Sequence, residues 1–359
     1  MDLVAQQMLL ATESIFNPTK QTKTIAEGIL LQRQILDKDK KHGVLRREDL
    51  LQMLHMGTLE ARGLYTMEEV EQVVNWARGN DPKLRLLAAK LLASSLNRAE
   101  TNFNVPRNEV AIRITDKNTG CLAYLLDLVA QNEITLHQEI PFEELHLDEV
   151  VGEGTAGTVY RGLWKEQRVA IKHFRNDIKH SEFIRELSLM SVVRHKNLVY
   201  CYGGVTIGGR MMIVQELMQA NLADVLATQD IEISMGLVIQ VALEVAQGVL
   251  FLHNHCNLIH RDLKSMNLLV NTIEGPDLVV KVCDFGVSRV IDKKKVMTGN
   301  IGTISWIAPE VFQQRKYSEK ADIYSFGIIL WELVTRQIPF ANLSSFGIPV
   351  SVIKGERPR

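Results

Sequence analysis

Residues 258–270 read LIHRDLKSMNLLV, a polar loop set between apolar residues. Asp262, Lys264 and Asn267 lie so close in this loop that a rigid backbone would bring their side chains into one small volume. An aspartate there can accept a proton from a substrate hydroxyl, a lysine can neutralise a migrating phosphoryl group, and an asparagine can ligate a divalent cation. The stretch therefore predicts chemistry on a phosphoryl group.

The composition argues against several other functions. With 46% hydrophobic and 23% charged residues, the chain has the balance of a globular protein, and its net charge of −1 gives no electrostatic footprint for nucleic acid. No run approaches the roughly 18 apolar residues of a membrane span, and Glu332 interrupts even residues 328–334. The N-terminus lacks the basic start of a signal peptide.

The cysteines indicate the compartment. Four are spread along the 359 residues without a CxxC pair, which is typical of free thiols in a reducing environment. We therefore expect a cytoplasmic protein. These cysteines are Cys121, Cys201, Cys256 and Cys283.

Residues 1–142 have the pattern of an all-α region. Thr66 and Glu69 have the spacing of a capping box. The pair at 81–82, Asp-Pro, predicts another helix start, because the carboxylate can cap and the proline needs no amide donor. A polar loop is expected at residues 97–118 and a leucine-rich helix at 120–131.

The leucine-rich part of this region resembles an armadillo repeat, in which stacked helices bury leucine-rich faces. The resemblance covers one unit or two, and an insertion interrupts its middle. Because such repeats usually need three or more neighbours, an unrelated helical bundle is the alternative. Both interpretations give a regulatory region that binds a protein partner, and neither assigns chemistry.

A change to β-type sequence places a domain boundary near residue 143. Runs rich in Val, Tyr and Trp at residues 147–153, 157–163 and 168–174 are separated by short turns, which predicts an antiparallel meander. Residues 212–218 have the pattern of a further strand.

Further motifs accompany the polar loop in a definite order. Closely spaced glycines let a backbone approach phosphate oxygens, and the strand that follows them argues against a dinucleotide-binding fold. Lys172 closes an apolar strand, where a charge is costly unless it is paired. In this order the motifs resemble those of the protein kinases. They are GEGTAGTV at 152–159, VAIK at 169–172, DFG at 284–286, GT at 302–303, APE at 308–310 and DIYSFG at 322–327.

The resemblance implies an α+β, bilobal kinase fold after the all-α region. A β-rich small lobe would span about residues 143–218 and a mainly helical large lobe residues 219–359. It also implies transfer of the γ-phosphate of ATP to protein hydroxyls, with Mg²⁺ as the metal. The alternative is a nucleotide-binding scaffold of kinase shape that transfers no phosphate.

The resemblance also assigns roles. Asp262 would act on the substrate hydroxyl with help from Lys264, and Lys172 would hold the α- and β-phosphates. Glu186 is the expected partner of Lys172, with Glu182 as the alternative. The metal ligands would be Asn267 and Asp284.

The implied nucleotide site combines the glycine-rich loop, apolar walls for adenine and the hinge at residues 216–218. Its apolar members would be core residues with or without nucleotide, so they are weak evidence by themselves. The set is Gly152, Gly154, Gly157, Val159, Ala170, Lys172, Gln215 at the gatekeeper position, Glu216, Met218 and Leu269.

The subgroup can be narrowed by resemblance. Lys264, together with the GT pair at 302–303, resembles serine/threonine-specific kinases. The segments PFEEL, GLWKEQRVAIK and GTISWIAPE resemble the tyrosine-kinase-like group, whose members mostly phosphorylate serine or threonine. Arg261 could clamp a phosphorylated activation segment, with Thr298 and Ser288 as the acceptors. The alternative for these two residues is that they are solvated loop residues.

The chain ends at Arg359, whereas members of the resembled family continue for several helices. We therefore expect an incomplete large lobe, in which residues 328–334 keep uncovered apolar surface. Glu310 would then be a buried carboxylate without its arginine partner.

Overall fold

The computed structural model describes residues 66–97, 107–116, 120–131, 133–154, 157–272, 278–285, 304–313, 315 and 318–359. The chain divides into two compact units. The first comprises Met1–Ile114 and Thr119–Leu125, and the second comprises Thr115–Asn118 and Leu126–Arg359. The start of the catalytic domain near residue 143 stays a prediction.

Two helices of the first unit begin at the capping residues that the sequence predicts. α4 (Met67–Arg78) follows Thr66, whose Oγ1 accepts a hydrogen bond from the backbone N–H of Glu69 at 3.1 Å. α5 (Pro82–Asn97) follows Asp81, whose Oδ1 accepts backbone hydrogen bonds from the first turn. The two helices pack against each other through buried valines and leucines.

The polar loop predicted for residues 97–118 is wrong in part, because α6 (Arg107–Thr115) lies within it. The charged and polar residues around the helix outweighed its short apolar face in the sequence pattern. The leucine-rich helix predicted at residues 120–131 is confirmed as α7 (Cys121–Ala130). The buried apolar residues of α6 are Val110, Ala111 and Ile114.

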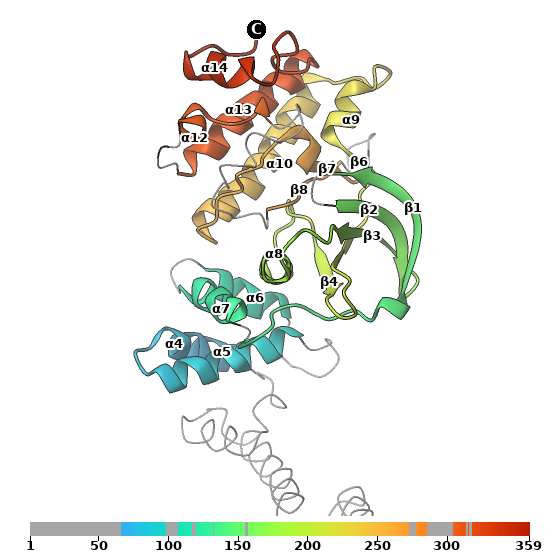
Figure 1. Ribbon diagram of the computed structural model, residues 1–359. Coiled ribbons are helices and arrows are strands. Elements are labelled where there is room, and N and C mark those ends of the chain that lie inside the picture. The colour runs from blue at the N-terminus through green and yellow to red at the C-terminus, as the bar shows by residue number, and fades with distance from the viewer. Residues whose placement is uncertain are drawn as a thin grey trace, which may run out of the picture. The chain divides into compact units, whose positions relative to one another are not determined.

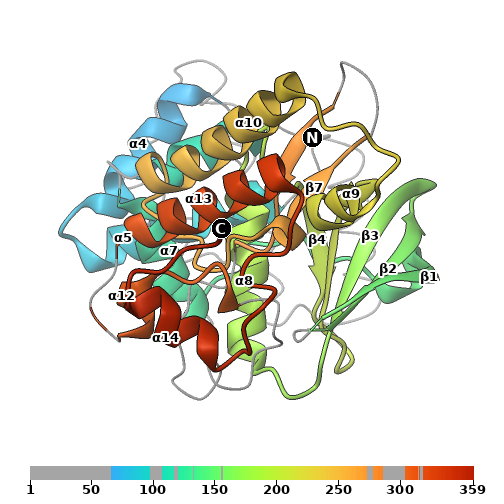
Figure 2. The same cartoon turned by 90° about the horizontal axis from the view of Figure 1, so that it is seen from above.

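The second unit contains a five-stranded antiparallel sheet in the order β1-β2-β3-β5-β4. Figures 1 and 2 show this sheet and label its strands β1, β2, β3 and β4. The sheet confirms the predicted meander and the strand that follows it, and it forms the small lobe. The strands are β1 (Leu145–Glu153), β2 (Gly157–Trp164), β3 (Gln167–Phe174), β4 (Cys201–Val205) and β5 (Met212–Glu216).

The register of this sheet positions the residues of interest. A tight turn at Lys165 and Glu166, both at positive φ, joins β2 to β3 and pairs Val159 with Lys172. The glycine-rich segment before Val159 therefore lies beside the lysine. α8 (His180–Val192) packs against β4 and carries Glu186.

A short segment before β1 extends the sheet at its β4 edge. The backbone N–H of Ile140 donates to the carbonyl of Gly204 at 2.8 Å, and the N–H of Gly204 donates to the carbonyl of Gln138 at 3.0 Å. Glu139 forms a parallel bridge with Gly204, and its carboxylate accepts hydrogen bonds from the N–H and hydroxyl of Thr206. Ile140 is fully buried among the apolar residues of the sheet.

The large lobe combines a small sheet with helices. The sheet has the order β6-β7-β8, and β8 packs on α10. In this lobe the 3-10 turn η4 (Ser265–Asn267) precedes β7. A second 3-10 turn, η3 (Phe142–Glu144), precedes β1 of the small lobe. The elements are β6 (Ala220–Asn221), α9 (Leu222–Ala227), α10 (Met235–Asn254), β7 (Leu268–Val270), β8 (Val280–Val282), α12 (Pro309–Phe312), α13 (Lys320–Thr335) and α14 (Gly347–Ile353).

α10 is the one helix in the described part of the chain that is long and apolar enough to cross a membrane by length and composition. Its buried face contains Val241, Val245 and Val249 and packs on β8 and α13. A core helix of a folded lobe passes the same test. The packing accounts for the apolar residues of the buried face, whereas Ile239, Leu243 and Leu250 of the same helix are more than half exposed.

The expectation for Glu310 is wrong. Glu310 is half-buried at the start of α12 rather than enclosed in the core, so its carboxylate needs no buried arginine. Apolar side chains of α13 and α14 do reach the surface: Val334 is 62% exposed and Val350 is 52% exposed.

Candidate active site

Lys172 lies between two carboxylates in the second unit. Its Nζ is 2.7 Å from Asp284 Oδ1 and 3.6 Å from Glu186 Oε1. Lys172 is itself buried at the end of β3, where an unpaired charge would be costly. Glu186 comes from α8, as the sequence predicts. Asp284, which the sequence assigns to the metal alone, is the nearer partner of the lysine.

Burial and mutual attraction set the charges of these groups. Burial by itself opposes the charge on Lys172, but attraction by Asp284 and Glu186 outweighs it and raises the lysine pKa. Burial also opposes the charge on Asp284, yet Lys172 holds the pKa of that carboxyl below its ordinary value. At Glu186 burial prevails, and the pKa is raised despite Lys172. Lys172 and Asp284 therefore form the charged pair.

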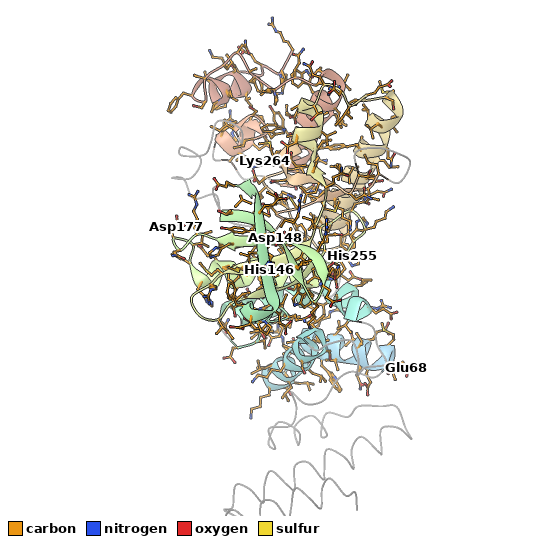
Figure 3. The ribbon with its side chains drawn as sticks, turned by 90° about the vertical axis from the view of Figure 1, so that its right-hand side faces the viewer. Glu68, His146, Asp148, Asp177, His255 and Lys264 are labelled. Carbon is orange, nitrogen blue, oxygen red and sulfur yellow. The ribbon has the colours of Figure 1, made fainter. Side chains whose placement is uncertain are left out.

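The polar loop brings its three predicted side chains together. Lys264 donates from Nζ to Asp262 Oδ2 at 2.8 Å. Asn267 donates from Nδ2 to the carbonyl of Asp262 at 2.7 Å and to its Oδ2 at 3.1 Å. The Asp262 side chain is 34% exposed, so a substrate hydroxyl can approach it. Lys264, labelled in Figure 3, directly precedes the turn η4 (Ser265–Asn267).

A backbone hydrogen bond joins the segment that carries Asn267 to the segment that carries Asp284. The N–H of Cys283 donates to the carbonyl of Asn267 at 3.0 Å, at the point where β7 and β8 pair. Since the amide nitrogen of Asn267 faces Asp262, its amide oxygen is the atom suited to a cation.

Oxygen ligands from Asn267 and Asp284 fit a hard divalent cation. No cluster of three or more His, Cys, Asp or Glu side chains that could hold a metal is found among the described residues. A cation here would thus take its remaining ligands from water or from the phosphates of a bound nucleotide.

Asp322, at the start of α13, binds the backbone of the polar loop through its carboxylate. Its carboxylate accepts hydrogen bonds from the backbone N–H groups of His260 and Arg261, at 2.8 and 2.9 Å, and contacts His253 Nε2 at 2.7 Å. Burial alone would raise its pKa, but these hydrogen bonds outweigh burial and lower it.

The backbone is strained on both sides of the site. Arg261 and Asp284 have φ values of 70° and 57°, in the left-handed region that side chains other than glycine seldom occupy. Such positions cost about 1–3 kcal/mol and persist only where surrounding contacts fix them. Asp322 supplies that contact for Arg261, and Lys172 supplies it for Asp284.

The three glycines of the GxGxxG segment are not equivalent. A Cβ on Gly157 would lie 2.0 Å from the carbonyl oxygen of His173 in β3, so the sheet itself requires glycine there. Among the residues that the structure describes, a Cβ on Gly152 or Gly154 would meet nothing closer than 3.9 Å. The sheet therefore does not explain these two glycines, and close approach of a ligand would.

Gly157→Ala is expected to destabilise the folded state by about 1–3 kcal/mol, because β2 and β3 must separate to admit the methyl group. The matched control, Gly154→Ala, should leave the melting temperature without nucleotide unchanged. Thermal melts of both variants without ligand test this difference, and equal melting temperatures would contradict it.

The predicted hinge residues follow one another at the end of β5. Gln215 is buried, Glu216 and Met218 are half-buried, and the N–H of Gln219 donates to the carbonyl of Val270 in β7. Three apolar residues predicted as adenine walls are half-buried and come from β2, β3 and β7. These are Val159, Ala170 and Leu269.

Glu216 has a partner that the sequence analysis missed. Lys281 in β8 donates from Nζ to both carboxylate oxygens of Glu216, at 2.7 and 2.8 Å. The N–H of Tyr200 donates to the same carboxylate at 2.7 Å. This ion pair joins the end of the small-lobe sheet to the strand before Asp284.

Residues 145–359 match the family model described as protein tyrosine and serine/threonine kinase. The chain belongs to this family. Its bilobal α+β fold is therefore confirmed, and the ordered motifs that resemble a kinase belong to a kinase domain. ATP and a divalent metal are the reactants and cofactor that this family uses in general.

Curated relatives are similar over the kinase domain. A probable serine/threonine-protein kinase of Dictyostelium discoideum is 39% identical over 227 residues, which cover 61% of this chain and 24% of that protein. Serine/threonine-protein kinase STY17 of Arabidopsis thaliana is 39% identical over 227 residues, covering 62% of this chain and 39% of that protein. The chain thus spans less than half the length of these relatives.

Not every predicted site residue of the kinase can be placed. Ser288, Thr298 and the GT pair at 302–303 lie outside the described residues. Arg261 is half-buried within the polar loop at residues 258–270, which is the catalytic loop of the kinase domain. Cys283 is buried, and burial raises the pKa of its thiol well above the ordinary value, so it is not a reactive thiol.

Two buried carboxylates were missed as functional groups. Asp322 was recognised only as part of DIYSFG, and Glu332 only as an interruption of residues 328–334. Both are acidic residues within an apolar helix, and that is the signal that could have identified them. A carboxylate in such a place must have partners or be protonated.

Proposed function

We propose that this chain is an ATP-dependent serine/threonine protein kinase, which transfers the γ-phosphate of ATP to hydroxyls of protein substrates. The observation that carries the proposal is the convergence of Lys172, Asp284, Asn267 and Asp262 from three segments, which are β3, the polar loop and the residues after β8. A scaffold that only binds nucleotide would not need Asp262 and Lys264 hydrogen-bonded beside the other groups.

Each side chain has a definite part in the proposed reaction. Asp262 accepts hydrogen bonds from Lys264 and Asn267, which hold its carboxylate in one orientation toward the substrate hydroxyl. It orients that hydroxyl and accepts its proton as the oxygen attacks the γ-phosphorus. Lys264 carries a positive charge 2.8 Å from Asp262 and offsets negative charge that develops nearby.

The nucleotide is held from the small lobe. Lys172, kept in place by Glu186 and Asp284, binds the α- and β-phosphates, and Gly152 and Gly154 leave room for phosphate beside the backbone. Adenine lies between the half-buried apolar residues and pairs with the hinge backbone. Asn267 and Asp284 hold Mg²⁺, which supplies charge neutralisation at the phosphates.

Serine/threonine specificity is proposed together with membership of the tyrosine-kinase-like group, and the following observations support the specificity. The relatives in Dictyostelium and Arabidopsis bear serine/threonine-protein kinase names. Lys264 two positions after Asp262 agrees with them. Thr298 and Ser288 are the proposed phosphorylation sites, with Arg261 as the group that would bind the phosphate.

The region before residue 143 is proposed to be a regulatory, armadillo-like helical module that binds a protein partner. α4 and α5 pack as a helical pair, and the buried face of α5 is rich in leucine, which agrees with this proposal. We place the protein in the cytoplasm, because its four buried cysteines form no disulfide with one another.

The test uses the whole 359-residue chain. Mg²⁺-ATP should raise its melting temperature by mass action, and radiolabelled phosphate should appear on serine or threonine of a generic protein substrate. Asp262→Asn is expected to lower transfer by about a thousandfold while leaving the melting shift with Mg²⁺-ATP unchanged. Asp148→Asn, which changes an exposed aspartate of β1 (labelled in Figure 3), is the matched control.

Each result has a clear meaning. Stabilisation with label on serine or threonine supports the kinase. Stabilisation without label identifies a nucleotide-binding scaffold and contradicts the proposed activity. Label on tyrosine contradicts the specificity, and full activity of Asp262→Asn contradicts the role of that residue.

A further inference from the structure

A buried carboxylate in the middle of α13 joins two segments of the large lobe. Glu332 is 6% exposed, and its two oxygens have different partners. Ser265 donates from Oγ to Oε1 at 2.9 Å, and Trp306 donates from Nε1 to Oε2 at 2.7 Å. Neither partner is a cation, and burial raises the pKa of Glu332 to about 7.

The first partner lies inside the catalytic loop. Ser265 begins the turn η4, directly after Lys264 and two residues before Asn267. The N–H of Asn267 donates to the carbonyl of Lys264 at 2.9 Å and closes the turn. Lys264 and Asn267 both contact Asp262, so the position of this turn decides where these two side chains lie around Asp262.

The second partner belongs to the segment Ile304–Ala308. Trp306 is 5% exposed, and its carbonyl accepts a hydrogen bond from Ser325 Oγ of α13 at 2.7 Å. The neighbouring Ser305 donates to the carbonyl of Pro339 at 3.1 Å. Side-chain hydrogen bonds therefore fix this segment to α13 and to the chain that follows it, and the bond to Glu332 ties it to the catalytic loop.

A purely structural role does not explain a carboxyl group at this place. Burying one without a cation is costly, and an apolar side chain of the same volume would avoid that cost but would leave the buried donors of Ser265 and Trp306 without an acceptor. What an apolar residue cannot do is accept hydrogen bonds from Ser265 and Trp306 at once. The two-sided contact is therefore the feature that needs a functional reason.

We propose that Glu332 is a positioning residue for phosphoryl transfer, which holds the Ser265 turn against Trp306 and so fixes Lys264 and Asn267 around Asp262. The proposal rests on the kinase function proposed above. It assigns Glu332 to the hydroxyl side of the reaction, because the contacts of Lys172 with Glu186 and Asp284 do not include it.

The test compares variants that keep or remove the two hydrogen bonds. Glu332→Gln can keep both, since its oxygen can accept from Trp306 while its amide donates to the Ser265 hydroxyl. Glu332→Leu keeps the volume and removes both. Ser265→Ala and Trp306→Phe remove one each. Glu319→Leu, an exposed position at the start of the same helix, is the matched control.

Steady-state kinetics with Mg²⁺-ATP and a serine/threonine peptide provide the readout. Glu332→Leu is expected to lower kcat by about a hundredfold, and Ser265→Ala by about tenfold, with the KM for ATP unchanged. Glu332→Gln should stay within about threefold of the wild type. A role in stability alone would lower the melting temperature without this division between kcat and the KM for ATP.

The outcomes separate this inference from the proposed function. If the wild type transfers phosphate and Ser265→Ala and Glu332→Leu match it, the positioning role is refuted and the kinase function stands. An inactive wild type that binds Mg²⁺-ATP refutes both. If Glu332→Leu fails to fold, Ser265→Ala decides, because it removes only a hydroxyl. Equal loss in Glu332→Gln and Glu332→Leu also refutes the positioning role.

Discussion

Lys172→Met is expected to lower phosphoryl transfer by about a thousandfold while the chain still folds. Methionine fills the space of the lysine stem at the end of β3 but removes the charge that lies 2.7 Å from Asp284 and 3.6 Å from Glu186. A fixed positive group aimed at phosphate oxygens accelerates the reaction by a factor of this order, because the site around it is buried and already organised. The measurement is radiolabelled transfer to a serine/threonine substrate.

The same change should loosen nucleotide binding. With the lysine gone, Glu186 and Asp284 lose the charge that offsets their burial, so the pKa values of both carboxyls should rise. Lys165→Met, at an exposed lysine of the β2–β3 turn, is the control and should behave as the wild type. Retained transfer in Lys172→Met, with a normal melting shift on Mg²⁺-ATP, would show that Lys172 has no part in the reaction.

Asp322→Ala is expected to destabilise the chain by about 3–5 kcal/mol at pH 7. The carboxylate is 1% exposed and accepts hydrogen bonds from the backbone N–H groups of His260 and Arg261 besides its contact with His253. Removing it leaves buried donors without an acceptor and releases the left-handed conformation of Arg261. The melting temperature should fall by roughly 10 °C, and transfer should be lost with it.

The effect should depend on pH with a definite sign. The pKa of Asp322 is lower in the folded state than in the unfolded chain. Its contribution to stability is therefore complete above the unfolded pKa near 4 and is lost as the pH falls through the folded pKa. Denaturant melts at pH 7 and at about pH 3, below the unfolded pKa, should show the difference between wild type and variant shrinking at the lower pH.

Asp177→Ala is the control for this comparison. Asp177 is exposed in the loop between β3 and α8 and is labelled in Figure 3. It should shift the melting temperature by no more than a degree or two at either pH, roughly what surface substitutions do. A pH-independent loss in Asp322→Ala would mean that cavity formation, rather than the carboxylate, accounts for the destabilisation.

Local patterns were sufficient for much of the fold. The strands β1, β2 and β3 lie within a few residues of their predicted limits, because short alternating runs between turns leave little choice of structure. The capping residues Thr66 and Asp81 fix the starts of α4 and α5 for a similar reason. Each of these signals is complete within about ten residues of sequence.

Contacts between distant segments could not be read in this way. The choice of Asp284 over Glu186 as the nearer partner of Lys172 depends on where the turn after β8 places the carboxylate. Lys281 meets Glu216 across 65 positions of sequence, and Glu332 meets Ser265 across 67. No local pattern encodes such pairs. The helix α6 was missed for a different reason, because its buried apolar face is only about one turn long.

The pairing of residues 138–140 with β4 has a consequence for how a catalytic fragment should be cut. A fragment that begins at residue 145, where the kinase family match starts, would remove Ile140 from the small-lobe core and uncover the backbone of β4. Uncovered strand edges pair with other chains, so such a fragment would tend to aggregate through β4. A soluble catalytic fragment should therefore retain these residues, which lie outside the family match.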